Sequence, residues 1–319
     1  MSKVSIVFRA LNEEEWFEQA ILACKSQKLD AGLELELILV DSGSTDATLD
    51  IALKHDLCLV HITKSEFTFG RSLNWGCEAA DGDYLVFISA HCIPSHERWL
   101  QNLVQPLVDG AASYSYGRQL GHEVSKFSET QLFEKYFPEF DRIPQAGYFV
   151  NNANSAIKAD VWAKYRFDEE CTGLEDMVLG QQIVNDGHKI GYVADAPVIH
   201  IHEETLAQTR NRYYREALTL RDIMPEVQLT RLDAVRYFFA GAFHDVAAAI
   251  EQKKFLSKFT EIIGFRFMQY QGAFRGHNEL RKLSRAQKEA YFYPKPAKAH
   301  HARRPEPVLS HKTLQSESS

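Results

Sequence analysis

The sequence predicts an α/β fold, with a Rossmann-like, mostly parallel sheet flanked by helices and a helical C-terminal extension. Two observations support this prediction. Short apolar runs such as residues 4–8 and 35–40 alternate with amphipathic helical segments up to about residue 205, and such runs are typical of strands buried on both faces of a parallel sheet. Polar residues follow the runs directly, and ligands of open α/β sheets bind outside the carboxyl ends of the strands.

The first strand–helix unit places charged residues directly after a strand. The strand at 4–8 is followed by Arg9 and by a run of three glutamates from Glu13, which favours the start of a helix at 16–24. The right-handed crossover rule places the end of this strand and of the next on one edge of the sheet, which suits a nucleotide-sized ligand. Neither a Gly-x-Gly-x-x-Gly fingerprint nor a P-loop occurs, so neither motif explains this site.

The second unit ends at Asp41, whose carboxylate can accept hydrogen bonds from a base or a ribose. We expect Gly43 to form a tight turn, and Ser44 or Thr45 to cap a helix at 47–54. A plain strand–turn–helix with a capping aspartate is the alternative interpretation of this segment.

The remaining elements are predicted from the same patterns. We expect strands at 57–62 and 84–88, a helix with Leu73, Cys77 and Ala80 on one face, a helix after Pro94, strand-and-loop segments at 117–119 and 151–157, a short helix from Val161, a helix at 177–185 and an edge strand at 189–193. From 206 to about 291 the pattern is helical with a break near Pro225. Residues 294–319 are rich in Pro, His, Lys and Ser and predict a disordered tail. We therefore expect an α/β domain at 1–205 and a helical region at 206–293.

Composition and cysteine content indicate an ordinary soluble protein. The chain has 319 residues, of which 45% are hydrophobic and 25% charged. No apolar run reaches the length of about 18 residues that a membrane-spanning helix needs. The five cysteines are scattered without a pairing motif, and Met1 leads directly into the first core strand. We therefore expect reduced thiols in a cytoplasmic protein without a leader segment.

The net charge of −7 conceals an uneven distribution. Residues 207–319 contain 20 Lys and Arg against 11 Asp and Glu, a balance of +9, whereas residues 1–206 contain 16 against 32, a balance of −16. A basic C-terminal part suits an anionic partner, such as an anionic membrane surface or a lipid-linked phosphate. A solvated helical face, a bundle packed on the α/β domain, or a homodimer interface is the alternative. We expect no nucleic-acid partner.

Five segments together resemble the family 2 glycosyltransferases, which are inverting nucleotide-sugar enzymes with the GT-A fold. The segments are VSIVFRALNEEE (4–15), ILVDSGSTDATL (38–49), FGRSLNWGCEAADGDYLVFISAHCIP (69–94), NNANSAIKADVW (151–162) and GLEDM (173–177). Within the family the chain looks closest to the rhamnosyltransferase branch, which carries Ser-Ala-His where most members have Asp-x-Asp. The resemblance covers roughly residues 3–205.

The resemblance implies a nucleotide site at the predicted sheet edge. Asp41 is implied to contact the base. Arg71, a forked hydrogen-bond donor, is a candidate for a phosphate contact, and a salt bridge to Glu66 or Glu78 is its alternative role. The full set implied to surround the nucleotide is Arg9, Asn12, Glu13, Asp41, Ser42, Gly43, Arg71, Asn74, Ser89 and Ala90.

His91 departs from the Asp-x-Asp pattern and predicts a different metal preference. Imidazole suits transition metals, whereas Mg²⁺ prefers oxygen ligands. The family often has a histidine near the position of His200, so the resemblance implies a His91/His200 pair that would suit Mn²⁺. His202 alternates with His200 along the predicted strand, so we expect the two to face apart. A divalent cation, Mn²⁺ or Mg²⁺, is thus the expected cofactor, and a hydrogen-bonded residue at a strand end is the alternative for each histidine.

Glu175 and Asp176 are the candidate catalytic carboxylates. Inverting transfer needs a general base that removes the proton of the acceptor hydroxyl. In the family pattern the aspartate is the base, which implies this role for Asp176 and an orienting or acceptor-binding role for Glu175. We expect the helix N-terminus to lower the pKa of the Asp176 carboxyl. Trp99, Trp162 and the loop at 151–156 are candidates to border the sugar, and a place in the core is the alternative for Trp162.

The resulting hypothesis is inverting transfer of a sugar from a nucleotide-sugar donor, either dTDP-rhamnose or a UDP- or GDP-hexose. The acceptor is expected to be a glycan or a lipid-linked oligosaccharide in surface polysaccharide synthesis, such as capsule or O-antigen, at the inner face of the cytoplasmic membrane. The alternative is a catalytically silent GT-A-like module used for binding or scaffolding. The presence of Glu175, Asp176 and Arg71 favours the enzyme.

Overall fold

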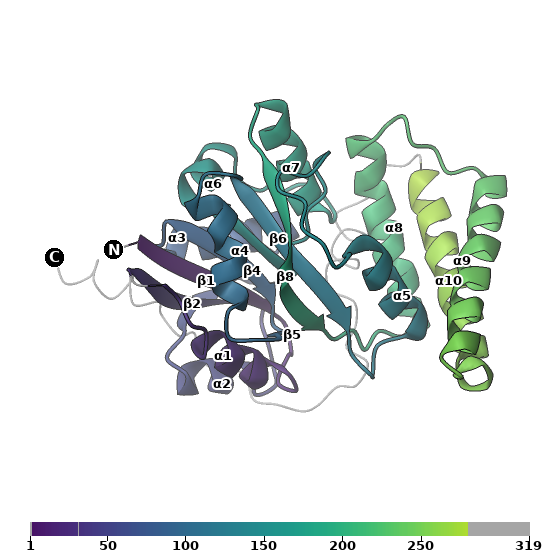
Figure 1. Cartoon of the computed structure of the whole chain (residues 1–319), viewed down its shortest axis with the longest axis horizontal. Helices are drawn as coiled ribbons and strands as arrows, with labels where there is room; N and C mark the ends of the chain where they lie inside the picture. The colour runs from purple at the N-terminus through teal and green to yellow at the C-terminus, as the bar shows by residue number, and fades with distance from the viewer. Residues whose placement is uncertain (1, 31, 280–319) are drawn as a thin grey trace.

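Residues 2–30 and 32–279 are described by the structure, which is a computed structural model of the chain. Within these residues an eight-stranded sheet is flanked by helices, and a group of long helices lies beside it (Figure 1). The strands are β1 (Ser2–Ala10), β2 (Leu33–Asp41), β3 (Cys58–His61), β4 (Tyr84–Ser89), β5 (Cys92–Pro94), β6 (Tyr114–Gly121), β7 (Asn154–Lys158) and β8 (Ile190–His200). The helices are α1 (Phe17–Lys25), α2 (Thr48–Lys54), α3 (Phe69–Ala79), α4 (Trp99–Val108), α5 (Phe127–Tyr136), α6 (Ala159–Tyr165), α7 (Glu175–Asn185), α8 (Leu206–Ile223), α9 (Arg231–Glu251) and α10 (Phe255–His277).

The strand order places the carboxyl ends of four parallel strands side by side. The order is β3-β2-β1-β4-β7-β6-β8-β5, and β1 is parallel to both β2 and β4. The register sets Ala10 beside Asp41 and Arg9 beside Ser89. β7 is antiparallel to both of its neighbours, so the sheet is mixed. The predicted meeting of the first two strand ends at one edge is confirmed.

The core consists of two apolar layers, one on each face of the sheet. On one face, Phe8 of β1 belongs to the same cluster as Phe17 of α1 and Leu103 of α4. On the other face, the neighbouring Val7 lies in a cluster with Leu179 of α7, to which α3 and α6 also contribute. Both faces of the central strands are therefore buried, which is why their sequences are almost continuously apolar.

The helices α8, α9 and α10 form a group in which α10 contacts both of the others (Figure 1). Both α8 and α9 begin with a capping box. The approach of α10 to α8 is close, because a Cβ added at Gly272 or Gly276 would clash with backbone oxygens of α8. Between α9 and α10, Arg266 donates two hydrogen bonds of 2.7 Å to the buried carboxylate of Asp245.

Most of the predicted elements are found, with three corrections. The strand expected at 189–193 extends to His200 and pairs with β6 and β5 on its two sides, so it is not an edge strand. A register shift in β6 after Gly117 lets the pairing continue past Pro197. The sequence pattern does not predict α5, because the residues of this helix are on average not hydrophobic. The N-cap of α2 is Ala47, and the backbone N–H of Thr48 is bound by the Asp46 carboxylate rather than by the expected hydroxyls.

The C-terminal region confirms the predicted helical character as far as it is described. The break near Pro225 separates α8 from α9, and a second break at 252–254 separates α9 from α10. The predicted helix up to 291 and the predicted tail at 294–319 extend outside the described residues, which end at 279. No helix in the described ranges is both long and apolar enough to cross a membrane. No disulfide bond joins any two of the five cysteines, all of which lie within the described residues.

Candidate active site

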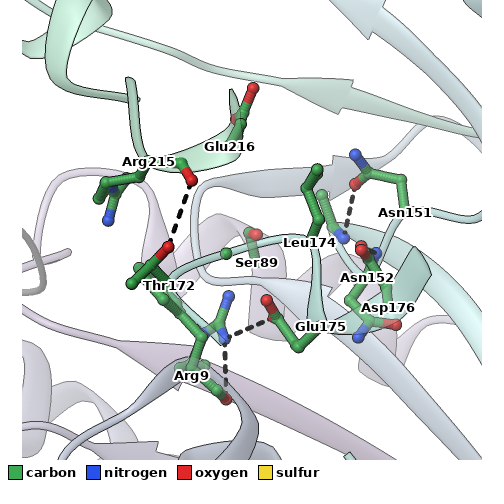
Figure 2. A pocket seen from close by; sticks show the side chains of 13 residues that line it. Arg9, Ser89, Asn151, Asn152, Thr172, Leu174, Glu175, Asp176, Arg215 and Glu216 are labelled. Carbon is green, nitrogen blue, oxygen red and sulfur yellow. Dashed lines mark hydrogen bonds and ion pairs between the residues drawn. The ribbon is translucent and has the colours of Figure 1, made fainter. Parts of the chain in front are cut away.

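A pocket lies at the sheet edge where the parallel strands end (Figure 2). Its walls come from the ends of β1 and β4, the loop before β7, the turn and first residues of α7, and the middle of α8. The lining residues are Arg9, Phe69, Ser89, Asn151, Asn152, Ala153, Thr172, Gly173, Leu174, Glu175, Asp176, Arg215 and Glu216. Carboxylate, guanidinium and amide groups thus converge in one pocket, as expected for binding of a charged and hydroxylated ligand.

Asp176 is buried in this pocket. Its two carboxylate oxygens accept hydrogen bonds from the backbone N–H groups of Asn152, at 2.9 Å, and Met177, at 2.8 Å. Burial and the nearby charge of Glu175 raise the pKa of the Asp176 carboxyl to about 7. The expected lowering of this pKa is wrong, because removal of the carboxylate from water outweighs the two backbone hydrogen bonds at the helix start. A carboxyl with a pKa near neutrality suits a general base.

Glu175 and Arg9 form an ion pair beside Asp176, with 3.2 Å between Oε1 and Nη1 (Figure 2). The Arg9 guanidinium also donates to the carbonyl oxygen of Phe69 at 3.3 Å and lies 4.8 Å from the centre of the Phe69 ring. The guanidinium of Arg215 lies 5.0 Å from the same ring. Two cations are therefore held in the pocket wall, where they favour an anionic ligand.

The turn before α7 has an unusual backbone and is connected to α8. Leu174 has φ 55° and ψ 30°, in the left-handed region, which costs a residue with a side chain about 1 kcal/mol or more. The Thr172 hydroxyl donates to the carbonyl oxygen of Arg215 at 3.3 Å (Figure 2). The C-terminal region thus helps to hold the turn that positions Glu175 and Asp176.

The turn after β2 is built around the buried carboxylate of Asp41. This carboxylate accepts hydrogen bonds from the backbone N–H groups of Gly43, at 2.9 Å, and Ser44, at 3.1 Å. Gly43 has φ 94°, which a residue with a side chain rarely adopts. Asn12 accepts a hydrogen bond of 2.8 Å from the N–H of Thr45 and so joins the turns after β1 and β2.

These turn residues lie at the expected sheet edge but do not line the pocket of Figure 2. Of the other residues implied to surround the nucleotide, Ser89 lines the pocket, whereas Ser42 and Ala90 are buried. The contact of Asp41 with a base stays a prediction.

Of the two ligand contacts predicted in α3, that of the buried Asn74 is replaced by contacts within the protein, and that of Arg71 stays a prediction. Asn74 is buried, and its amide donates to Glu169 and accepts from the indole of Trp162. Arg71 forms its ion pair with Glu169 at 2.7 Å, and not with either of the two glutamates expected. Trp162 and Trp99 both pack in the core, and neither lines the pocket. The sugar-bordering role considered for Trp99 is therefore wrong, and the core alternative for Trp162 is confirmed.

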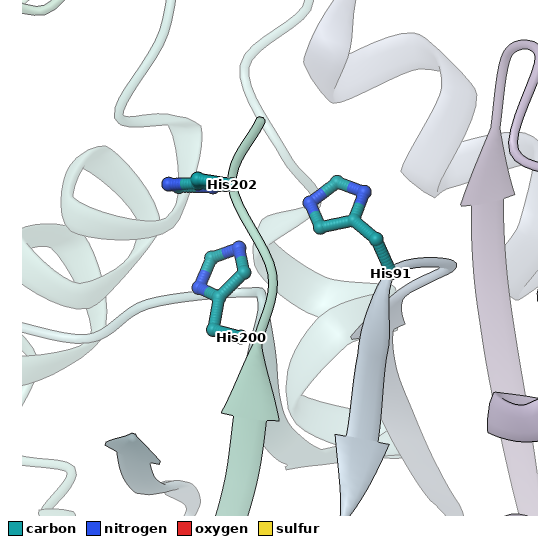
Figure 3. A group of neighbouring side chains, drawn as sticks. All are labelled: His91, His200 and His202. Carbon is teal, nitrogen blue, oxygen red and sulfur yellow. The ribbon is translucent and has the colours of Figure 1, made fainter. Parts of the chain in front are cut away.

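Three histidines gather at the end of β8 (Figure 3). One ring nitrogen from each of His91, His200 and His202 lies within 4.8 Å of those of the others. The rings of His91 and His200 stack with their centres 5.2 Å apart. The expectation that His200 and His202 face apart is wrong, because β8 ends at His200 and the alternation of a strand does not extend beyond it.

Each of these histidines directs its Nδ1 at a hydrogen-bond acceptor. The partners are Glu13 for His91 at 3.0 Å, Gln119 for His200 at 2.6 Å and Glu129 for His202 at 2.7 Å. Such contacts place a proton on Nδ1 and leave the Nε2 lone pair for a metal. The Nε2 atom of His200 is buried and has no hydrogen-bond partner among the described residues. The donor set therefore fits a transition-metal ion.

The pKa values of two of the histidines are shifted in opposite directions. Burial and the two neighbouring histidines lower the pKa of His200 well below its usual value, so His200 is neutral at pH 7. Burial also acts to lower the pKa of His91, but the charge and hydrogen bond of Glu13 more than offset this, so the pKa is raised.

Sequence reasoning did not identify the contribution of α8 to the pocket. Arg215 and Glu216 lie in an amphipathic helix in which no motif distinguishes them from other surface residues. Burial raises the pKa of the Glu216 carboxyl. The proximity of His202 to the other histidines was likewise not foreseeable from strand periodicity. By contrast, the loop at 151–153 lines the pocket, in agreement with the expectation for 151–156.

Comparison with known proteins identifies the family. The sequence profile described as glycosyl transferase family 2 matches residues 5–165, about half of the chain. The chain belongs to glycosyl transferase family 2. The fold around the matched residues, with the pocket at the strand ends, agrees with this assignment and with the resemblance found in the sequence.

Relatives of this family 2 glycosyltransferase include two O-antigen chain rhamnosyltransferases. WbaN from Salmonella anatum is 28% identical over 190 residues, which cover 56% of this chain and 60% of the relative. RfbN from Salmonella typhimurium is 24% identical over 225 residues, covering 66% of this chain and 70% of the relative. The similarity therefore spans 60–70% of the length of these two relatives.

Solved structures show the same fold. The mannosyltransferase PcManGT from Pyrobaculum calidifontis, in complex with GDP-Man and Mn²⁺, superposes with a TM-score of 0.59 at 16% identity, covering 86% of this chain and 87% of that one. TarS 1-349 from S. aureus, in complex with UDP-GlcNAc, has a TM-score of 0.53 at 15% identity, covering 93% of each chain. The GT-A fold with C-terminal helices is therefore confirmed.

Proposed function

We propose that this glycosyltransferase moves one sugar, with inversion, from a nucleotide-sugar donor to a glycan or lipid-linked oligosaccharide in surface polysaccharide synthesis at the inner face of the cytoplasmic membrane. The observation that carries the proposal is the buried Asp176, whose carboxyl has a pKa of about 7 and lies in the pocket at the strand ends. Inverting transfer needs one base. Asp176 suits this role better than Glu175, because Glu175 is paired with Arg9.

In this proposal the acceptor hydroxyl gives its proton to Asp176 as its oxygen attacks the anomeric carbon. The bond from that carbon to the nucleoside diphosphate breaks at the same time, and negative charge develops on the leaving phosphate. Arg9 and Arg215, both next to the Phe69 ring, are the cations of the pocket wall that can stabilise this charge. Glu175 orients Arg9 through their ion pair.

The proposed donor is dTDP-rhamnose. The names of the two O-antigen relatives and the Ser-Ala-His sequence at 89–91 support this choice. UDP- and GDP-hexoses are the alternatives, because two solved structures of the same fold are complexes with GDP-Man and UDP-GlcNAc. A silent binding module is the second candidate function, and it is disfavoured because the pocket contains a carboxyl tuned to act as a base.

We further propose that His91, His200 and His202 hold a divalent metal ion. The unpaired Nε2 of His200 and the acceptors on each Nδ1 support this. Nitrogen ligands favour Mn²⁺ or another transition metal over Mg²⁺. When bound, such an ion offsets negative charge on a pyrophosphate.

Transfer is tested by screening nucleotide sugars for thermal stabilisation of the full chain and then measuring release of nucleoside diphosphate with and without acceptor glycans. Ligand at a hundredfold excess over Kd stabilises the folded state by about 2.7 kcal/mol. We expect one donor to stabilise the protein and to turn over, and Asp176→Asn to bind it with turnover lowered by about 10²–10⁴-fold. Binding of a donor without any hydrolysis or transfer would support the silent module.

The metal site is tested by calorimetry on chelator-treated protein. We expect Mn²⁺ to bind, Mg²⁺ to bind at least about tenfold more weakly, and His200→Ala to abolish Mn²⁺ binding. His244→Ala is the matched control, because His244 lies exposed on α9 outside the histidine cluster. Equal affinity for both ions, or unchanged Mn²⁺ binding in His200→Ala, would remove the metal from this site.

A further inference from the structure

We propose that the outward face of α9, together with the turn into α10, binds an anionic membrane surface. This face is defined by the exposed apolar residues Leu232, Val235, Phe239, Phe243, Ile250 and Leu256 and by the exposed basic residues Arg231, Arg236, Lys253 and Lys254. We call it the α9 face. The inference rests on the membrane location in the proposed function and specifies the surface responsible, but it depends on neither the sugar nor the metal.

The apolar residues of the α9 face form one stripe along the helix. At 3.6 residues per turn, the five that lie within α9 fall inside an arc of about 80°. Their exposure is large, reaching 68% for Phe243, and Leu256 in the first turn of α10 is 94% exposed. Single exposed apolar residues are common, but a continuous stripe of this length is typical of a surface that contacts a partner or a membrane.

The exposure of the stripe does not result from poor packing of α9. The adjoining side of the helix packs against α10, where Asp245 is fully buried and bound to Arg266 by two hydrogen bonds. Ala242 and Ala249 are also buried on that side. The orientation of α9 is therefore fixed by its buried side, and the exposed stripe runs beside that side, with Val235 and Phe239 at the groove between α9 and α10.

A groove between α9 and α10 extends the apolar surface. It has a volume of about 430 Å³ and is lined mostly by apolar and aromatic side chains, among them Phe238 and Phe239 of α9 and Phe267 and Phe274 of α10. Phe267 is itself exposed. A groove of this kind can accept part of an acyl chain at the level of the lipid headgroups.

The charges on the α9 face select an anionic partner. Between residues 231 and 260 the exposed charged residues are Arg231, Arg236, Lys253 and Lys254 against Glu251. The other carboxylates in α9 are not exposed, since Asp245 is buried and Asp233 is half-buried within its capping box. An apolar stripe flanked by four cations matches a bilayer that contains anionic lipid.

The same charges argue against a second copy of the chain as the occupant. In a twofold dimer the identical patch is present on both sides of the interface. Two α9 faces would therefore bring the four cations of one copy against the four cations of the other, with only Glu251 to offset them. A bilayer meets the stripe and the cations together.

The test is flotation of the full chain with phosphatidylcholine vesicles that contain either no anionic lipid or about 30% phosphatidylserine. We expect association with the anionic vesicles only, and loss of it when salt is raised from about 0.1 M to about 1 M. The Arg231→Gln/Arg236→Gln variant should bind about 30-fold more weakly, at about fivefold per cation. The Phe239→Ser/Phe243→Ser variant should also bind more weakly, by at least about tenfold.

The matched control is Phe140→Ser, because Phe140 is an exposed phenylalanine in the segment between α5 and β7. It should float like the wild type. Because all variants keep residues 280–319, any contribution of that basic segment to lipid binding is the same in the wild type and in every variant. Asp176→Asn should float normally, so failure of the proposed activity and failure of this inference are distinguishable.

Two results would overturn the inference. The first is that the wild type stays in the soluble fraction with anionic vesicles at low salt. The second is that both double variants float like the wild type. Light scattering distinguishes a membrane from a second copy of the chain as the occupant of the α9 face. If the wild type is a dimer, and Phe239→Ser/Phe243→Ser makes it a monomer without changing flotation, the α9 face binds a second copy.

Discussion

Replacing Asp176 with asparagine separates its chemical role from its structural role. In the wild type both carboxylate oxygens accept backbone hydrogen bonds, of 2.9 Å and 2.8 Å. Asparagine has the same size and keeps one acceptor, but it cannot take a proton from the acceptor hydroxyl. We expect kcat for sugar transfer to fall by about 10²–10⁴-fold. The affinity for nucleoside diphosphate should stay nearly unchanged, because the base acts on the acceptor and not on the donor.

The pH dependence gives a second readout of the same residue. Burial, with the charge of Glu175, raises the pKa of the Asp176 carboxyl to about 7, and only the ionised form can accept the proton. Below about pH 7, log(kcat/KM) should therefore rise with a slope near one, and it should level off above that pH. The slow residual activity of Asp176→Asn should lack this ascending limb.

The raised pKa also predicts a change in stability with pH. A carboxyl whose pKa is higher in the folded state, here about 7 against 3.8, contributes stability below pH 3.8 and loses that contribution as the pH rises through 7. The shift corresponds to at most about 4 kcal/mol. Loss of one charge-assisted hydrogen bond in Asp176→Asn offsets about 1.5–3 kcal/mol of this. We expect the variant to be more stable than the wild type by about 1–2 kcal/mol at pH 8, and the gain to disappear by pH 4.

The matched control is Asp186→Asn at the other end of α7, where the carboxylate is 53% exposed. This variant should keep the wild-type rate and pH profile. The reasoning about Asp176 fails if Asp176→Asn retains more than about a tenth of the wild-type kcat, or if its activity keeps the ascending limb near pH 7. Glu175 would then be the first alternative base.

Three further predictions concern binding and packing. Asp41→Ala should weaken nucleoside diphosphate binding by about 1–3 kcal/mol, and an unchanged calorimetric affinity would remove Asp41 from the nucleotide site. Asp245→Ala leaves the buried Arg266 unpaired and should lower the free energy of unfolding in urea by about 3–5 kcal/mol; a loss below about 1 kcal/mol would mean that water replaces the carboxylate. Gly272→Ala should force α10 away from α8 and reduce stability by about 1–3 kcal/mol, whereas an unchanged melting temperature would contradict the close approach of the two helices.

The parts of the site that the sequence predicts are those fixed by strand geometry. Each buried run ends at a polar residue, and parallel neighbours end on the same edge. The positions of Arg9 and Asp41 at one edge of the sheet follow from these two rules, and the register confirms them. A place for Ser89 in the same site was expected only through the family resemblance, and the register sets it beside Arg9. The location of Asp176 in the same pocket was expected only through the family resemblance, because no local pattern connects the start of α7 to the end of β1.

The parts that the sequence does not predict depend on packing between distant segments. The pKa of Asp176 rises because the pocket excludes water from it, and burial of this kind cannot be inferred from a helix start. The position of His202 depends on where β8 ends, and strand periodicity gives no information beyond that residue. Asn74 has a side-chain amide of the kind that often binds ligands, but this amide is hydrogen-bonded to the indole of Trp162 and the carboxylate of Glu169.

The C-terminal helices connect the proposed membrane surface to the proposed active site. α8 provides Arg215 to the pocket and binds the turn before Asp176 through Thr172. α10 packs closely on α8 at Gly272, and α9 is held to α10 by the buried pair of Asp245 and Arg266. Each of these contacts is buried or made by backbone atoms, so the three helices hold a fixed orientation relative to the pocket. If the α9 face lies on a bilayer, the same contacts fix the distance and direction from the lipid surface to Asp176, which determine which lipid-linked sugars can reach the base.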